Sequence, residues 1–249
     1  MKSLLHKKRK HKYGSVALIG VTFPKLRNGE VAAVAAGGHR RNFCDSFRVN
    51  SVRVLFGLLE FSAHVHYNSK LFPIVQETFR TAGMQAFSAR DINESDAMTE
   101  VCLRLNRSLI EAEGPAHSCP AFLGCYNEDL GTVCYVNAGH TPGLVRHSSD
   151  TSELTATGLP LGLFSHTTLE AGIIALEPGA AMIVVSKDVV EAESRGEAFG
   201  LRGVSASLRS FDGVSAQDLC LFIIQAAQQY SRQAKTHELV ALSLIRRIT

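Results

Sequence analysis

The sequence lacks paired cysteines and lacks any hydrophobic run long enough to cross a membrane. Its six cysteines are scattered with no CxxC pair, which argues against a zinc ribbon or a thiol redox motif and fits a reducing cytoplasm. The most apolar stretch, residues 171–185, is interrupted by Glu177, Pro178 and Gly179, whereas a membrane helix needs about 20 apolar residues. We therefore predict a cytoplasmic protein with no membrane span.

A strong net charge is also missing. The formal net charge is only +3, so no field over the whole protein points to nucleic acid. The basic residues from Lys7 to Lys12 form one run, and no apolar segment follows it as in a signal peptide. We expect residues 1–13 to be a disordered basic tail. Contact of this tail with an anionic membrane or with nucleic acid stays open as the alternative.

The composition is that of an ordinary globular protein. Hydrophobic residues make up 45% and charged residues 20% of 249 residues, enough to bury a large core without disulfides or metals. No internal repeat and no low-complexity linker divides the chain. We predict a single domain over residues 14–249.

The first third of the chain gives the weakest secondary-structure signal. Residues 16–19 and 30–36 are typical of strands, and Asn28-Gly29 predicts a hairpin turn between them. From residue 45 to about residue 83 the pattern is mixed and is broken at Pro73. We expect helices in this region.

The remainder alternates clear helices and strands. A helix capped by Ser95 or Asp96 and a second one starting at Ser215 are predicted from apolar residues at helical spacing. In the first helix these apolar residues are Met98, Val101, Cys102, Leu105 and Leu109. Strands are expected at 121–126, 132–137 and 238–248, and a hairpin of 169–176 with 180–186. Hairpin strands with helices before and after them indicate an α+β fold.

Six short segments, in order, carry a resemblance to a known family. They resemble SpoIIE/RsbU-type PPM serine/threonine phosphatases, whose matching segments read LN..L, YVNAGHNPP, G.PLG, L.PGD, YTDGVTEA and GE.FG. The resemblance covers roughly residues 98–249. The segments here are LRLNRSL at 103–109, YVNAGHTP at 135–142, GLPLG at 158–162, LEPG at 176–179, VVEA at 189–192 and GEAFG at 196–200.

The resemblance implies an architecture, a reaction and a class of partner. The expected fold is an α-β-β-α sandwich of two antiparallel sheets flanked by helices. The implied reaction is hydrolysis of phosphoserine or phosphothreonine on a small partner protein, such as an anti-sigma-factor antagonist. In the family, aspartates hold two Mn²⁺ or Mg²⁺ ions that activate water and clamp the phosphoryl oxygens.

The aspartates that the resemblance requires are missing. The family segments GGDFYD and GDVSGHG match best at residues 20–23 and 36–38, which puts Thr22 and Gly37 at the two ligand positions. No aspartate precedes Asp45. The aspartate of TDGVTEA is replaced by Lys187, and the aspartate of the terminal DDITLV strand by His237.

The replacements lead to a prediction and an alternative. An ammonium group cannot ligate a cation, so Lys187 would supply positive charge and hold Asp188 or Glu238, unless it is merely a solvated residue. Because neighbouring strand residues point to opposite faces, Asp188 would point away from the site. We predict a pseudophosphatase with no cofactor. The alternative is an active phosphatase with one metal held by His237, Glu238 and Asp188.

Other histidines are weaker candidates. His140 could act as a catalytic base, but the sequence around Gly139 favours a tight strand connection. His39 could join His237 in a transition-metal site, although no HExxH spacing supports it. His64 and His66 alternate, as on one face of a strand.

Overall fold

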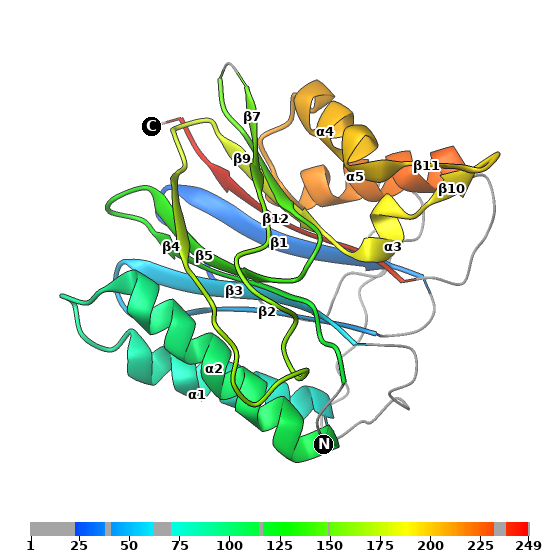
Figure 1. Cartoon of the computed structure of the whole chain (residues 1–249). Coiled ribbons are helices and arrows are strands. Elements are labelled where there is room, and N and C mark those ends of the chain that lie inside the picture. The colour runs from blue at the N-terminus through cyan, green and yellow to red at the C-terminus, as the bar shows by residue number, and fades with distance from the viewer. Residues whose placement is uncertain are drawn as a thin grey trace, which may run out of the picture.

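A computed structural model describes residues 23–37, 41–61, 71–114, 117–148, 150–231 and 238–248. Two antiparallel sheets pack face to face, and helices cover the outer face of each sheet (Figure 1). This is the predicted α-β-β-α sandwich. The expected basic tail, the strand at 16–19 and His39, His64 and His66 lie outside the described residues.

The first sheet joins the two ends of the described chain. Its strand order is β1-β12-β9-β6-β7, with all neighbours antiparallel. A short hairpin of β10 (Glu193–Ser194) and β11 (Glu197–Ala198) lies beside the helices on its outer face, α3 (Lys187–Val190), α4 (Gly200–Ser210) and α5 (Ala216–Ser231). The strands are β1 (Gly29–Ala36), β12 (Leu239–Arg246), β9 (Ala181–Val185), β6 (Gly143–Arg146) and β7 (Thr151–Leu154).

The second sheet has the order β2-β3-β4-β5-β8 and is also antiparallel. Two long helices, α1 (Leu71–Ala86) and α2 (Glu94–Glu113), cover its outer face. The strands are β2 (Asn42–Arg48), β3 (Arg53–Glu60), β4 (Ala121–Asn127), β5 (Thr132–Ala138) and β8 (Gly172–Ala175).

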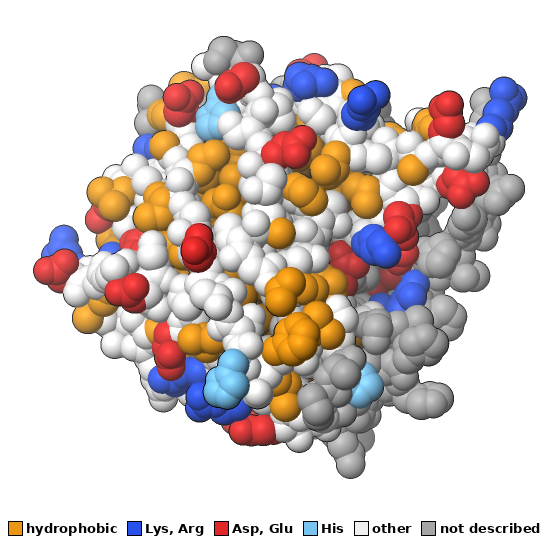
Figure 2. Space-filling view, in the orientation of Figure 1, with side chains coloured by type: hydrophobic (Ala, Val, Ile, Leu, Met, Phe, Trp, Pro, Cys, Tyr) orange, Lys and Arg blue, Asp and Glu red, His pale blue; other side chains and the backbone are white. Residues whose placement is uncertain are grey.

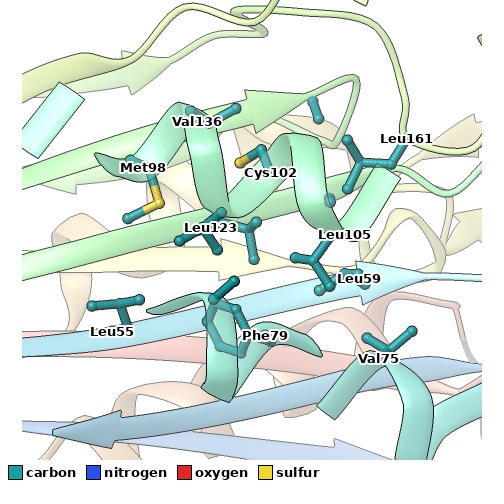
Figure 3. Close-up of a cluster of buried hydrophobic side chains, with 14 of the residues drawn as sticks. Leu55, Leu59, Val75, Phe79, Met98, Cys102, Leu105, Leu123, Val136 and Leu161 are labelled. Atoms are coloured by element: carbon teal, nitrogen blue, oxygen red, sulfur yellow. The ribbon is translucent and has the colours of Figure 1, made fainter. Parts of the chain in front are cut away.

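Three hydrophobic layers hold this sandwich together. Figure 3 shows the layer between the second sheet and its helices, where Phe79 of α1 points toward Leu123 and Leu105 of α2 lies beside Leu59. A second layer lies between the two sheets around Phe56. The third lies between the first sheet and α4 and α5. Burial of such apolar surface is the main force that stabilises the fold.

The long helices and most of the later strands were predicted correctly. α2 spans Glu94–Glu113 and ends at Gly114, but its cap is Asn93, whose side chain accepts the backbone N–H groups of Ser95 and Asp96. The cap therefore lies two residues before Ser95 and three before Asp96, the two predicted positions. α5 begins as expected, with the Ser215 hydroxyl accepting the Asp218 N–H at 3.4 Å.

The helices expected over residues 45–83 are present only from Leu71 onward, and Pro73 lies within that helix instead of breaking the pattern. The region 45–83 contains most of β2 and all of β3 before α1 begins at Leu71. β3 is buried at seven of its eight positions, from Arg53 to Leu59, because one face meets the helices and the other meets the first sheet. A strand that is covered on both faces shows no alternation of apolar and polar residues, so the sequence pattern gives no sign of it.

The expected hairpin of 169–176 with 180–186 is also wrong. β8 pairs with β5 in the second sheet, whereas β9 lies between β12 and β6 in the first. The turn at Glu177-Pro178-Gly179 therefore carries the chain from one sheet to the other. Among the described residues, no helix is both long enough and apolar enough to span a bilayer.

Candidate functional site

The strand ends of both sheets meet at one edge of the sandwich. Because Ala36 pairs with Leu239 and Val185 pairs with Ala241, the residues just beyond these strands lie at the same end of the first sheet. In the second sheet, Asn42 at the start of β2 pairs with Glu60 at the end of β3. Hydrogen bonds described next join these two groups across the sandwich.

Glu238, directly before β12, fastens β2 to the first sheet. Its Oε2 accepts the backbone N–H of Arg41 at 2.7 Å, the backbone N–H of Asn42 at 3.0 Å and the Asn42 side-chain amide at 3.1 Å. Glu238 is only 5% exposed. We call this cluster of Arg41, Asn42 and Glu238, together with Glu60, the interstrand clasp.

Glu60 completes the clasp from β3. Its Oε1 accepts the backbone N–H of Lys187 at 2.9 Å. His140 Nε2 lies 2.9 Å from the same oxygen, at an angle that is poor for a hydrogen bond. The imidazole is fully buried, and its Nδ1 lies 3.0 Å from the Thr141 carbonyl oxygen. Glu60 therefore faces two nitrogen groups of the chain itself.

His140 also belongs to a tight connection after β5. Its backbone N–H is accepted by Asn137 Oδ1 at 2.8 Å. Gly139 has a φ of 65°, and a Cβ atom there would collide with Pro160, so glycine is required. The segment NAGH thus fixes the backbone and also delivers an imidazole to Glu60.

The charged residues of α3 are arranged differently from our expectation. Lys187 Nζ pairs with Glu191 at 3.2 Å, and its side chain is 66% exposed. Asp188 pairs instead with Arg41 at 3.3 Å. The prediction that Lys187 holds Glu238 or Asp188 is wrong, as is the argument from strand alternation, because residues 187–190 form a helix.

Four of the sequence-predicted site residues lie at this edge. Gly37 follows β1, Lys187 and Asp188 follow β9, and Glu238 precedes β12. Gly37 offers no side chain, and its φ of 117° is one that glycine adopts readily. Thr22 and His237 lie outside the described residues, so their convergence with Lys187 stays a prediction.

Sequence reasoning missed Arg41, Asn42 and Glu60. Two signals were present. Asn42-Phe43-Cys44-Asp45 follows the same pattern as DFYD in GGDFYD, and residues 59–64, LEFSAH, follow GDVSGH. Asparagine and glutamate stand where those patterns have aspartate.

The donor set does not fit a pair of hard cations. Mn²⁺ and Mg²⁺ bind carboxylate oxygens, and within the described ranges no three His, Cys, Asp or Glu residues are placed to share one ion. One oxygen of each carboxylate is already engaged: Oε2 of Glu238 and Oε1 of Glu60 accept N–H groups, and Oδ2 of Asp188 pairs with Arg41. A metal ion would have to displace these donors and approach a guanidinium.

The model of the family described as "Stage II sporulation protein E (SpoIIE)" matches residues 77–247. The chain belongs to the SpoIIE family. Members of this family use Mn²⁺ or Mg²⁺ and are PPM-type phosphatase domains, as the resemblance implied. No protein of curated function matches this chain.

Solved structures share the fold of this SpoIIE domain. The RsbU and RsbW domains of Rv1364c from Mycobacterium tuberculosis align over 92% of this chain and 64% of theirs, with 20% identity and a TM-score of 0.68. The structure of the PP2C phosphatase domain and a fragment of the regulatory domain of SpoIIE from Bacillus subtilis aligns over 89% of this chain and 64% of its own, with 11% identity and a TM-score of 0.72. The SiaA-PP2C domain of Pseudomonas aeruginosa aligns over 86% of this chain and 85% of its own, with 12% identity and a TM-score of 0.69. The chain thus spans 64% of the length of the first two.

Proposed function

We propose that this chain is a pseudophosphatase of the SpoIIE family that binds a phosphoprotein or another regulatory protein without a metal ion. The observation that carries the proposal is the interstrand clasp. Glu238 Oε2 accepts three N–H groups of the chain, Glu60 Oε1 accepts the Lys187 N–H, and Asp188 pairs with Arg41. Each of these carboxylates therefore already has a donor from the chain at an oxygen that a metal ion would use.

The clasp also revises the two early ligand positions. We propose that Asn42 and Glu60, rather than Thr22 and Gly37, occupy the two aspartate positions of GGDFYD and GDVSGHG. Their pairing across β2 and β3 and their contacts with Glu238 and Lys187 support this assignment. An amide is a weaker ligand for Mg²⁺ or Mn²⁺ than a carboxylate, so the change at Asn42 lowers the affinity for metal.

The class of partner rests on the family. The Mycobacterium tuberculosis relative carries an RsbU and an RsbW domain in one chain, which favours a role in regulation through proteins, such as an anti-sigma-factor antagonist. We place the protein in the cytoplasm, in keeping with six cysteines that are all buried and unpaired.

A second candidate is an active phosphatase with a rebuilt metal site. It is favoured by the presence of Glu60, Asp188 and Glu238 at one edge of the sandwich, and it would add His237. Titration of the full chain with Mn²⁺, followed by electron paramagnetic resonance and by hydrolysis of p-nitrophenyl phosphate, separates the two. We expect neither binding at millimolar Mn²⁺ nor turnover. Metal-dependent turnover that Glu238→Ala abolishes would replace our proposal with the second candidate.

A further inference from the structure

A groove lies on the outer side of α2, away from the clasp. Its volume is about 570 Å³, within the range of small-molecule sites. One wall is a face of α2 between residues 103 and 111, and the other is formed by residues 165–168. These residues belong to the connection between β7 and β8, drawn yellow-green, which descends across α2 (Figure 1).

A buried asparagine fixes the shape of this groove. Asn106 of α2 is 2% exposed. Its Nδ2 donates to the Phe164 carbonyl at 2.9 Å, and its Oδ1 accepts the Gly162 N–H at 2.8 Å. The connection is therefore tied to the helix on the N-terminal side of residues 165–168, and a ligand would meet a wall that is already ordered.

Three polar side chains that line the groove have no partner in the described part of the chain. Neither the Arg107 guanidinium nor the His166 imidazole makes a hydrogen bond or an ion pair there. Thr167 Oγ1 is buried and lacks a hydrogen-bond partner among the same residues. A buried hydroxyl without a partner is unfavourable, so turning the Thr167 side chain toward a ligand in the groove would relieve this cost.

These groups match the chemistry of a phosphate monoester. An arginine presents a planar fork of N–H donors that fits phosphate oxygens, and the hydroxyls of Ser165, Thr167 and Thr168 add further donors. Glu111 is the one carboxylate in the lining. Its charge repels any anion, so the phosphate is expected beside Arg107 and a basic residue of the partner beside Glu111.

We propose that this groove binds a phosphate monoester carried on a serine or threonine of a partner protein, an inference that rests on the proposed regulatory function. Two large apolar side chains of the same connection, Leu159 and Phe164, are each 54% exposed. Figure 2 shows this face, with hydrophobic side chains exposed over its middle and most charged ones near its edge. Such a surface suits the residues that flank a phosphorylated side chain better than it suits a free ion.

The test measures binding of three probes to the full chain by fluorescence anisotropy and by ¹H–¹⁵N shifts. The probes are a degenerate peptide with a central phosphothreonine, the same peptide with threonine, and AMP. We expect the phosphopeptide to bind at least about tenfold more tightly than either of the others, because charge-assisted hydrogen bonds to phosphate are the strong ones. The shifts should be largest at residues 165–168 and on the facing side of α2.

Matched variants decide the location. Arg107→Gln should weaken phosphopeptide binding about tenfold or more, and Thr167→Val, which keeps the shape of the side chain, about threefold or more. Arg202→Gln serves as the control, because Arg202 is an exposed helix arginine on α4. Melting curves confirm that each variant folds.

Three outcomes overturn the inference. They are no phosphopeptide binding at millimolar concentration, binding that Arg107→Gln leaves unchanged, and AMP binding at least as tightly as the phosphopeptide. Mn²⁺ titration of the same samples separates this test from that of the proposed function. A protein that turns over with Mn²⁺, yet loses the phosphopeptide on Arg107→Gln, would contradict the pseudophosphatase and keep the groove.

Discussion

Replacing Glu238 by alanine tests whether the interstrand clasp holds the two sheets together. The wild-type carboxylate accepts three N–H groups, from Arg41 and Asn42, and is nearly fully buried. Alanine would remove the acceptor and leave these donors at an edge that water reaches poorly. The Arg41 guanidinium would keep its ion pair with Asp188, because Arg41 contacts Glu238 through its backbone N–H.

The expected loss of stability follows from these contacts. A hydrogen bond to a charged group contributes about 1.5–3 kcal/mol, and a buried donor left unsatisfied costs about 1–3 kcal/mol. The side chain of Asn42 can turn to another partner, so we expect a total loss of about 3 kcal/mol rather than the full sum. For a domain of this size, about 2–4 °C per kcal/mol gives a fall in melting temperature of about 6–12 °C.

The assay is thermal and urea unfolding of wild type and Glu238→Ala, each with EDTA and with Mn²⁺. We expect the same destabilisation under both conditions, because the chain supplies the donors itself. Glu238→Gln keeps one oxygen acceptor without the charge and should lose about 1 kcal/mol. Glu177→Ala is the control, since Glu177 is exposed in the turn between the sheets.

Two results would refute this reasoning. A loss below about 0.5 kcal/mol in Glu238→Ala would mean that the clasp contributes no more than an ordinary surface contact. A wild-type protein that melts much lower in EDTA than in Mn²⁺ would mean that Glu238 holds a metal ion, because ligand binding to the folded state raises stability.

Three further predictions concern single side chains. Lys187→Asp should restore no phosphatase activity and should change stability by less than about 1 kcal/mol, because the Lys187 side chain is exposed and forms a surface ion pair with Glu191. Burial raises the pKa of Cys134 to about 11, so a thiol reagent at pH 8 should not label the folded protein and should label six cysteines in urea. Burial alone would raise the pKa of Glu128, but the hydrogen bonds and charges of Arg48 and its neighbours outweigh it and lower that pKa. The contribution of ionised Glu128 to the free energy of unfolding should be complete above about pH 4.3, the pKa of an unfolded glutamate. It should be lost as the pH falls through the lower pKa of Glu128 in the folded protein.

One result would contradict each of these three predictions. A loss of several kcal/mol in Lys187→Asp would show that the lysine is part of the clasp. Labelling of the native protein within minutes would show that the thiols are exposed. A Glu128→Gln variant whose deficit relative to wild type stays constant from pH 7 to pH 3 would show that the Glu128 carboxylate is not stabilised by its arginines.

Secondary structure could be predicted from the sequence where only one face of a helix or strand is buried. α2 presents Met98, Leu105 and Leu109 to the core and polar residues elsewhere, so its period is visible. β2 and β3 are covered on both faces, so neither shows a period, and both were missed. The turn at Pro178 was identified, but a turn does not reveal whether the next strand joins the same sheet.

The candidate site could be predicted only in part. Lys187 and Glu238 follow from motifs that keep their neighbours, and both lie at the predicted edge. Asn42 and Glu60 were missed because each differs from the expected aspartate, and a short pattern with such changes also matches elsewhere. The hydrogen bonds of Glu238 join residues about two hundred positions apart in the sequence. A short sequence motif cannot predict contacts of that separation.

The position of β12 has a consequence for how the chain folds during synthesis. It is the last described strand, yet it lies between β1 and β9. Until it leaves the ribosome, both of those strands present unpaired edges, and Glu238 is absent from a contact that spans 196 residues. Contacts of such separation form late, and unpaired edges invite aggregation. We therefore expect nascent chains that stop before β12 to depend on chaperones, and emergence of β12 from the ribosome to be the event that closes the first sheet.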